Sequence, residues 1–331
     1  MYILLTLFSM KYRKGPHMFR RTLLKLIIIL FVSTYGYCLS PPFSGDHPWF
    51  TGPLFTPSAR VVPAEHFNIE PYCTWVVNTG AYDNDGKVVS APRYNQITSQ
   101  LVCKVGLIDR VDFSLNAQSS YNWLGNLSAT GFRDLSVGFD FQLIEDSKDG
   151  MPLRLAVYEI FPTGRYENLK PRLLGVDSIG SGSYATHLGL STSRLFHFED
   201  NRYLNARCTV LTILYAPASV HGLNSYGGDP TTHGTIHPGF NYAVLLGAEY
   251  TLTDNWVLAL DIINGWSSKS TFKGDTIFPV GLRAGSNFSV APAIEYNWSK
   301  TIGVIVGGWC SFAGCNSPQF VGCSGAINVY F

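Results

Sequence analysis

The chain carries few charges and lacks the signatures of several common protein classes. Charged residues make up 14% of its 331 residues, whereas apolar residues make up 46%. Beyond residue 40 no apolar run reaches the roughly 18 residues that a transmembrane helix needs, which excludes such helices there. The seven cysteines form no C-x-x-C pair, so neither a zinc ribbon nor a thioredoxin-like site is predicted. No glycine-rich phosphate loop precedes a helix, and no cofactor is implied.

The first forty residues differ from the rest in charge, with six Lys or Arg and no acidic residue. A basic zone ending at Lys25, an apolar run over 26–32 and small residues over 33–36 are the three zones of a secretory signal. We predict a signal peptide over residues 1–40, with Met18 as an alternative start. The remaining chain has 24 − 6 = 18 basic and 23 acidic residues, a net charge of about −5. This balance argues against nucleic acid as a partner.

The C-terminal residues 321–331 alternate between two kinds of side chain. The apolar parity holds Val321, Gly325, Ile327, Val329 and Phe331, and the small or polar parity holds Gly322, Ser324, Ala326, Asn328 and Tyr330. Successive side chains in a strand point to opposite faces, so this strand presents one face to lipid and one to a wet lumen. A terminal Phe resembles the C-terminal signature by which the assembly machinery recognises bacterial outer-membrane barrels. The alternative is an edge strand of a soluble sandwich.

The same alternation recurs upstream. Residues 111–118 have apolar odd and polar even positions, and residues 134–143 continue such a pattern for ten residues. Strands of about 9–11 residues suit a tilted crossing of the hydrocarbon, whereas half-buried strands of soluble sheets alternate in the same way but are usually shorter. Counting from His66, we predict an all-β protein, a transmembrane antiparallel up-and-down β-barrel of about 12 strands over residues 66–331.

Short and long connections alternate strictly along these strands. Short ones are predicted at 108–110, 145–150, 199–202, 253–255 and 299–300, and longer ones at about 80–95, 122–130, 162–181, 216–236, 264–278 and 311–319. Outer-membrane barrels have this asymmetry, with short periplasmic turns and longer external loops. A sandwich has no reason to place every long loop at one end.

Aromatic residues gather beside the short turns. Phe196 and Phe198 precede one turn, Tyr296 and Trp298 precede another, and Trp256 follows a third. Amphipathic rings favour the headgroup level of a membrane, so these residues predict an aromatic girdle.

A proline-rich segment over residues 41–65 precedes the first strand and contains Trp49, Phe50 and Phe55. Prolines cannot donate to a sheet ladder, so the segment cannot build a sheet interior. It is either a periplasmic extension or a strap that enters the barrel mouth. We predict the periplasmic extension.

The polar parity assigns charged and polar side chains to the lumen. A lipid-facing Arg or Lys near the bilayer midplane costs about 2–4 kcal/mol, so such groups turn inward. The predicted lumen-lining and selectivity residues are Asp112, Asn116, Asp134, Asp140, Arg154, Arg207, Glu249, Asp261, Arg283 and Glu295. Such a lining sets a local field that selects permeating solutes. The alternative is a salt-bridged ladder that fills a narrow barrel without transport.

Six cysteines remain after removal of the signal, in an oxidising compartment. Cys73 lies near Cys103 if their two segments form a hairpin, and Cys310 and Cys323 flank the last predicted turn. These four are candidates for disulfides, and spacing leaves their pairing open.

Neither a metal site nor catalysis is predicted. His221, His233 and His237 share a long loop with Asp229, but their spacings of twelve and four residues match no common ligand motif. An outer-membrane hydrolase needs Ser, His and a carboxylate or amide together. The His-x-Ser-Asn-Gly motif expected of a phospholipase barrel is absent and no triad emerges, so we predict that the chain is not an enzyme.

Several short motifs resemble a known family. The glycine–aspartate strand opening at 130–138, the Phe-Pro-Thr-Gly at 161–164, the Gly-Ser-Gly-Ser at 180–183 and the turn at 252–256 are similar to the transporters named for the MetA pathway of phenol degradation. Arg133 stands where that family more often has Gly. The resemblance implies an outer-membrane β-barrel that passes small, often hydrophobic or aromatic, compounds.

These patterns together predict an outer-membrane channel or transporter for a small solute, by passive or facilitated diffusion. The alternatives are a surface-exposed adhesin or structural outer-membrane protein and, less favoured, an outer-membrane hydrolase. The expected partners are outer-membrane lipids, the solute, and the barrel assembly machinery through the strand ending at Phe331.

Overall fold

A computed structural model describes residues 50–145, 151–198 and 202–331, and strands dominate these residues. None of the helical segments among them is long and apolar enough to cross a membrane. The signal peptide predicted over residues 1–40 lies outside the described residues, as do most of the short turns predicted at 145–150 and 199–202. The strands of the barrel wall are β1 (Phe67–Tyr82), β3 (Asn95–Ile108), β4 (Val111–Leu124), β6 (Leu135–Ile144), β7 (Leu153–Phe161), β8 (Ala185–Phe198), β9 (Arg202–Tyr215), β12 (Asn241–Thr251), β13 (Trp256–Ser267), β15 (Gly285–Asn297), β16 (Ile302–Cys315) and β17 (Ser317–Tyr330). The remaining elements are β2 (Val88–Val89), β5 (Leu127–Phe132), β10 (Ala218–His221), β11 (His233–His237), β14 (Thr271–Asp275) and the short 3-10 helix η1 (Pro171–Leu173).

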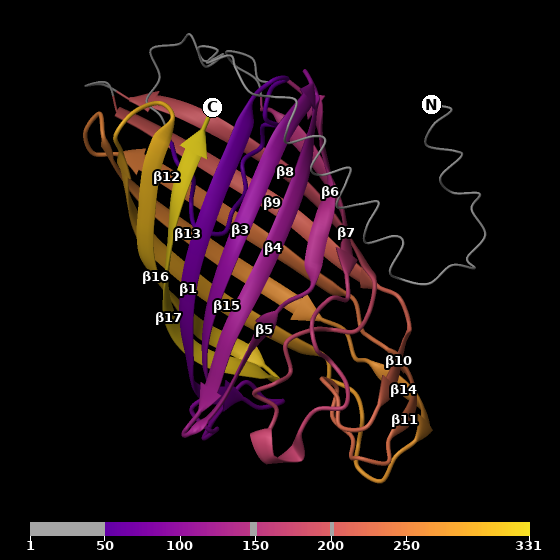
Figure 1. Cartoon of the computed structure of the whole chain (residues 1–331). Helices are drawn as coiled ribbons and strands as arrows, with labels where there is room; N and C mark the ends of the chain where they lie inside the picture. The colour runs from indigo at the N-terminus through magenta and orange to yellow at the C-terminus, as the bar shows by residue number, and fades with distance from the viewer. Residues whose placement is uncertain (1–49, 146–150, 199–201) are drawn as a thin grey trace, which may run out of the picture. The chain divides into compact units, whose positions relative to one another are not determined.

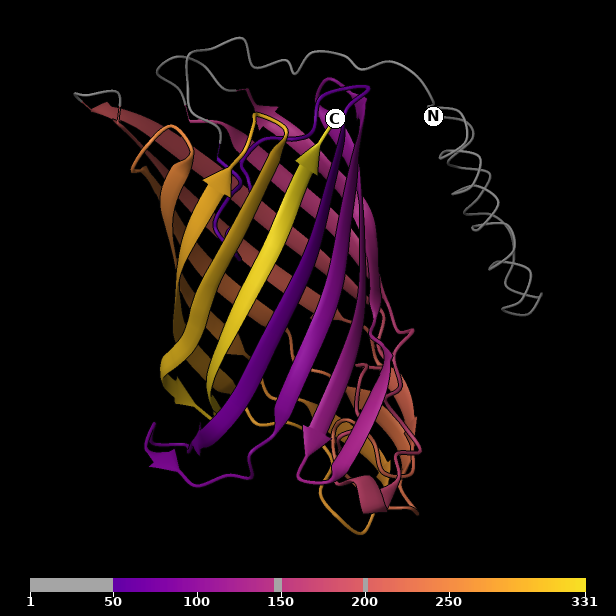
Figure 2. The same ribbon diagram turned by 60° about the vertical axis from the view of Figure 1, so that its left-hand side comes forward.

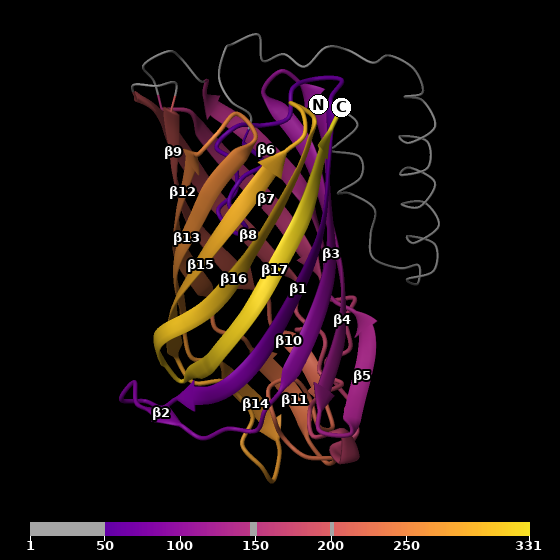
Figure 3. The same cartoon turned by 90° about the vertical axis from the view of Figure 1, so that its left-hand side faces the viewer.

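The wall strands close into a barrel (Figure 1). Neighbours in the chain pair antiparallel, and β17 pairs with both β16 and β1, which leaves no open edge. Figure 2 and Figure 3 show this closure from two further sides, with yellow β17 beside indigo β1. The main sheet has 14 strands, and β2 and β5 are additions to the wall, so 14 − 2 = 12 strands close the barrel in the described part of the chain. The predicted fold is confirmed.

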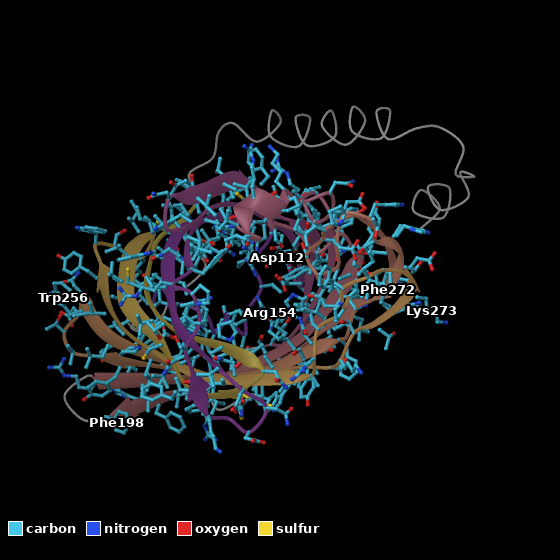
Figure 4. All side chains as sticks on the ribbon, turned by 90° about the horizontal axis from the view of Figure 1, so that it is seen from below. Asp112, Arg154, Phe198, Trp256, Phe272 and Lys273 are labelled. Atoms are coloured by element: carbon cyan, nitrogen blue, oxygen red, sulfur yellow. The ribbon has the colours of Figure 1, made fainter. Side chains whose placement is uncertain are left out.

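Side chains alternate across this wall as the sequence predicts. In β17, Val321 and Ile327 are exposed on the outer surface, whereas Ser324 and Asn328 are buried inside. Figure 4, viewed from the loop end, shows Asp112 and Arg154 inside the ring of strands and Phe198 and Trp256 outside it. A polar interior and an apolar exterior are the reverse of a soluble protein and the pattern of a barrel immersed in lipid.

Exposed aromatic rings lie beside the short turns, as predicted. The Trp256 and Tyr296 ring centroids are 4.7 Å apart, and those of Tyr296 and Trp298 are 5.2 Å apart. The Trp298 side chain is exposed, as are Phe196 and Phe198 beside another turn.

Two of the predicted long loops are instead strand hairpins. The chain passes from β4 to β5 through Gly125 and Asn126, and from β16 to β17 through Asn316 alone. Asn316 adopts a φ of 46°, the left-handed conformation that tight turns use and that Asn tolerates. The residues predicted as loops continue the strands instead. Their alternating polar and aromatic side chains suit a solvent-exposed two-stranded ribbon as well as a loop.

The other long loops at this end include a small folded lobe. Strands β10, β11 and β14 form a separate three-stranded sheet, visible at the loop end in Figure 1. Its core contains Val220, Tyr226 and Ile236, and Phe272 packs against it. The lobe therefore has its own apolar core.

The predicted Cys73–Cys103 proximity is wrong, because strand register separates the two residues. Cys73 lies opposite Ser99 in β3, four residues from Cys103. Four residues of strand span about 13 Å, too far for a disulfide. Both thiols are free.

Cys310 and Cys323 also do not pair. Cys323 lies opposite Gly308 and Cys310 opposite Val321, so the two cysteines are diagonal neighbours on β16 and β17. Diagonal positions are about 7–8 Å apart, beyond the usual Cα spacing of a disulfide. Every cysteine among the described residues is free.

Candidate functional site in the barrel lumen

Residues 50–65 run inside the lumen as a strap, which corrects the predicted periplasmic extension for these residues. Residues 41–49 lie outside the described part of the chain. The strap fits because three of its residues are prolines without an N–H, and several of its other amides donate to acceptors on the wall. The contact is close at Gly106 of β3, where an added Cβ would lie 1.6 Å from the Pro63 carbonyl oxygen.

Wall carboxylates accept hydrogen bonds from the strap backbone at three places. The Thr51 N–H donates to Glu295 Oε2 at 3.0 Å, and the Val62 N–H donates to Asp112 Oδ2 at 2.7 Å. Between them, the Thr56 N–H and hydroxyl donate to Asp261 Oδ1 at 2.9 and 2.6 Å. One oxygen of Glu295, one of Asp112 and both oxygens of Asp261 therefore hold the strap.

An amide and an apolar cluster complete this attachment. Gln142 accepts from the Val61 N–H at 2.9 Å and donates to the Ala59 carbonyl at 3.0 Å. Leu54 packs in a buried cluster with Ala259 and Ala291, whose small side chains leave room for it in the lumen. The strap thus has polar and apolar contacts with the wall.

A second group of charges surrounds Asp140 on β6. Lys104 Nζ lies 2.7 Å from Asp140 Oδ2, and the Tyr158 hydroxyl lies 2.7 Å from both carboxylate oxygens. Arg154 Nη1 lies farther away, at 3.6 Å from Asp140 Oδ1. Asp112 stands directly opposite Asp140 in the β4–β6 register. Two acids and two bases therefore meet at this level of the lumen.

A third group lies on the facing wall. Arg207 Nη2 is 2.7 Å from Glu249 Oε2, to which Asn205 Nδ2 also donates at 2.8 Å. Glu249 and Glu295 are both fully buried. Such buried ions require close partners, because desolvation costs several kcal/mol per ion.

A cavity of about 530 Å³ remains between the strap and the wall. Its basic lining residues are Arg60, Lys104, Arg154, Arg207 and Lys300, and Glu70 is the only acidic residue among the described residues that line it. Glu70 accepts hydrogen bonds from Asn68, Tyr72 and Asn328. Basic residues thus outnumber acidic ones among the charged residues that line the cavity, although the wall behind it buries the acids Asp112, Asp140, Glu249, Asp261 and Glu295.

Eight of the ten predicted lumen residues lie in or against this lumen. Asn116 lines the cavity, and the seven charged residues are buried in the wall or the lining. They are Asp112, Asp140, Arg154, Arg207, Glu249, Asp261 and Glu295. Their role in selectivity stays a prediction.

Two predicted lumen residues lie elsewhere. Asp134 sits between β5 and β6 and accepts hydrogen bonds from the Gly164 N–H at 2.9 Å and the Ser181 N–H at 2.8 Å, so it fixes the loop after β7. Arg283 is exposed in the loop before β15. Both lie at the loop end of a strand, where polar parity no longer distinguishes lumen from solvent.

Sequence reasoning missed several lumen residues. Lys104, Tyr158 and Glu70 share the inward parity of their strands, so the alternation rule could have found them. The strap amides carried no such signal, because a proline-rich segment without periodicity gives no orientation.

In the loop lobe, Asp229 organises a turn rather than a metal site. Its carboxylate accepts from the Thr231 hydroxyl at 2.5 Å and from the N–H groups of Ile277 and Phe278 at 2.7 and 3.0 Å. The hydrogen bond from the Thr231 hydroxyl, followed by that from the Phe278 N–H, holds the pKa of Asp229 well below its ordinary value. His221 pairs with Glu167 and His233 with Asp275, each at 3.0 Å. Within the described residues, no group of three or more His, Cys, Asp or Glu could hold a metal ion.

A closed wall with an apolar exterior, a polar interior and aromatic rings at the turn end defines an outer-membrane β-barrel protein. Within that class, the chain belongs to the family described as "Putative MetA-pathway of phenol degradation", whose model matches residues 88–324. The resemblance in the sequence motifs is confirmed.

One solved structure in particular has the same fold, and two others are more distantly similar. A crystal structure of an outer membrane channel from Pseudomonas putida F1 superimposes with a TM-score of 0.63 at 14% identity, covering 83% of this chain and 98% of that one. The NanC porin gives a TM-score of 0.43 at 9% identity, covering 80% and 98% of the two chains. The toluene transporter TodX from Pseudomonas putida gives 0.38 at 12% identity, covering 86% and 98%. No curated protein matches the chain in sequence.

Proposed function

We propose that this protein is a channel through which small solutes diffuse across the bacterial outer membrane. The observation that carries the proposal is the cavity of about 530 Å³ between the strap and the wall, lined by polar and charged side chains. A barrel that served only as a membrane anchor would be stabilised by filling this space. The family's description names phenol degradation, which supports our proposal that the solute is a small aromatic compound.

The strap sets how the channel works. It occupies part of the cross-section, so we infer a narrow path suited to single small molecules rather than a wide porin lumen. Charged side chains in the path select among solutes through their local field.

Planar-bilayer recording of the purified mature protein tests the proposal. We expect discrete conductance steps in KCl, smaller than those of open porins, and liposome swelling with small solutes. Protein that migrates as a folded barrel yet gives no conductance and no swelling would exclude a channel.

A surface-binding role is the second candidate, favoured by the loop lobe. Ile277 and Phe278 are 76% and 62% exposed on a turn fixed by Asp229. A folded lobe with exposed apolar side chains suits contact with a partner. Deleting the lobe strands β10, β11 and β14 while keeping every wall strand would abolish cell-surface binding under this candidate and leave solute flux intact under the channel proposal.

The outer face of the wall and its final strand each suggest a partner. The outer apolar side chains suit outer-membrane lipids. The Phe331 side chain is exposed, and its carbonyl accepts from the Phe67 N–H at 3.1 Å, so the end of the final strand is joined to the start of β1. We infer that assembly machinery binds this strand before closure; Phe331→Ala should slow assembly in cells without changing the conductance of refolded protein.

A further inference from the structure

The guanidinium of Arg154 is buried, yet its donors are poorly used. The side chain is 2% exposed and lines the cavity. Nε and Nη1 have no hydrogen-bond partner, and Nη2 lies 3.4 Å from Ser191 Oγ. An arginine offers five N–H donors, and a buried polar group without a partner requires an explanation.

Asp140 does not supply the missing acceptor. Its oxygens are taken by Lys104 and the Tyr158 hydroxyl at 2.7 Å, whereas Arg154 Nη1 stays 3.6 Å away. Asp112 accepts from the Val62 N–H through Oδ2, and its buried Oδ1 has no hydrogen-bond partner among the described residues. Arg154 Nε and Nη1 therefore have no acceptor within hydrogen-bond distance in the described part of the chain.

Arg154 belongs to a row of three polar residues that lie side by side on adjacent strands. Arg154 on β7, Ser191 on β8 and Thr209 on β9 are register partners, and the Thr209 hydroxyl donates to Ser191 Oγ at 2.9 Å. All three line the cavity. Ser191 Oγ accepts from both neighbours, so the donors that this row can offer to a ligand are the Arg154 N–H groups and the Ser191 O–H.

Toward the loop end of the barrel, the next rows of inward-facing residues are apolar and then aromatic. Ala156, Gly189 and Leu211 form the adjacent row, with small or apolar side chains facing the same cavity. Beyond them, Tyr158 and His187 pack edge to face with ring centroids 5.3 Å apart. Successive rows on one face of a strand are about 7 Å apart. A ligand whose charged group binds Arg154 would therefore place an attached aromatic ring over Gly189 and beside the Tyr158–His187 pair.

The charge beside the row favours a negative ligand at Arg154. Lys104 and Arg207 are each paired at 2.7 Å with a buried carboxylate, Asp140 and Glu249. Arg154 lies 3.6 Å from Asp140 Oδ1, which leaves its charge the least closely paired of the three. An Arg fork binds a carboxylate through two parallel hydrogen bonds.

We propose that the row formed by Arg154, Ser191 and Thr209 is a binding site for a small aromatic carboxylate. This inference rests on the proposed channel function and names the class of solute. The carboxylate accepts from Arg154 and from the Ser191 hydroxyl, and the ring lies on the apolar row.

Binding is tested on the purified full-length mature protein in detergent with benzoate and its neutral analogue benzamide, by calorimetry. We expect benzoate to bind roughly tenfold or more tightly than benzamide, since hydrogen bonds to a charged group are the stronger ones. Arg154→Gln should weaken benzoate binding by a similar factor and leave benzamide unchanged. Arg154→Lys, which keeps the charge but loses the fork, should give an intermediate loss and serves if the Gln variant does not fold. Arg283→Gln, in an exposed loop, is the matched control and should bind as the parent does.

Conductance measured in parallel separates the two proposals. Block of the current by millimolar benzoate, relieved in Arg154→Gln, supports both. Benzoate binding without any conductance would overturn the channel and keep the site. Conductance with equal binding of benzoate and benzamide, or unchanged benzoate affinity in Arg154→Lys, would overturn the site and keep the channel.

Discussion

Asp261 on β13 and Thr56 on the strap are joined by two hydrogen bonds to one carboxylate oxygen, at 2.9 and 2.6 Å. The Phe55 N–H donates to the other oxygen at 3.2 Å. One wall carboxylate therefore fixes the middle of the strap. We predict that Asp261→Asn loosens it, since the new amide cannot accept from Phe55, and hydrogen bonds to charged groups contribute about 1.5–3 kcal/mol.

Single-channel recording detects that change as a higher mean conductance with more current noise. Ser58→Ala is the control, because the Ser58 hydroxyl accepts only a local bond from the Arg60 N–H in an exposed part of the strap. Asp261→Asn channels as quiet and as narrow as the parent would show that this carboxylate does not hold the strap.

Lys104→Met should destabilise the barrel strongly. Lys104 and Asp140 form a 2.7 Å ion pair with side-chain exposures of 15% and 0%. Removal of one member of a buried pair leaves an uncompensated charge and costs about 3–5 kcal/mol. Urea unfolding in lipid, followed by gel mobility, measures the loss.

The matched control for this pair is Arg110→Gln. Arg110 and Glu145 lie 2.6 Å apart but are 59% and 61% exposed, and an exposed pair contributes about 0–1 kcal/mol. Equal losses of unfolding free energy in the two variants would contradict the distinction between lumen and surface pairs.

Val210→Arg should test which face of the wall meets lipid. Val210 is exposed in the middle of β9, while its neighbour Thr209 is buried inside. Arg facing lipid near the midplane costs about 2–4 kcal/mol, falling to about 0–1 near the interface. Unfolding of Val210→Arg in lipid should therefore occur at a clearly lower urea concentration than that of Asp254→Arg, placed at a short turn. Identical midpoints would mean that β9 does not cross the hydrocarbon.

The fold could be predicted because its causes are local in the sequence. The alternation along residues 134–143 follows from lipid on one side of the wall and water on the other. The alternation of short and long connections follows from the direction in which the barrel is assembled. The same rule placed Asp140 and Glu249 inside. It misplaced Asp134 and Arg283, because both lie where the strand leaves the membrane and both faces meet water.

The strap could not be predicted in this way. Its contacts connect residues far apart in the chain, such as Thr56 and Asp261, which are 205 positions apart. Nothing in a proline-rich segment without alternation indicates which wall residue accepts each amide. The unused donors of Arg154 also depend on side-chain distances, which a sequence does not contain.

Acidification should loosen the loop lobe before the barrel wall. Hydrogen bonds from Thr231 and from the Ile277 and Phe278 amides hold the pKa of Asp229 well below its ordinary value of about 3.9. Because the folded pKa is depressed, this carboxylate stabilises the lobe fully above about pH 4, and the contribution is lost as the pH falls below that value toward the folded pKa. Hydrogen exchange at the Ile277 and Phe278 amides should therefore show weaker protection, corrected for intrinsic rates, at pH 3 than at pH 6.

In the Asp229→Asn variant these amides should be less protected already at pH 6 and lose little more protection at pH 3. Asp275→Asn, at an exposed carboxylate of the same lobe, should keep the parent's acid step; an unchanged acid step in Asp229→Asn would assign the effect to another group.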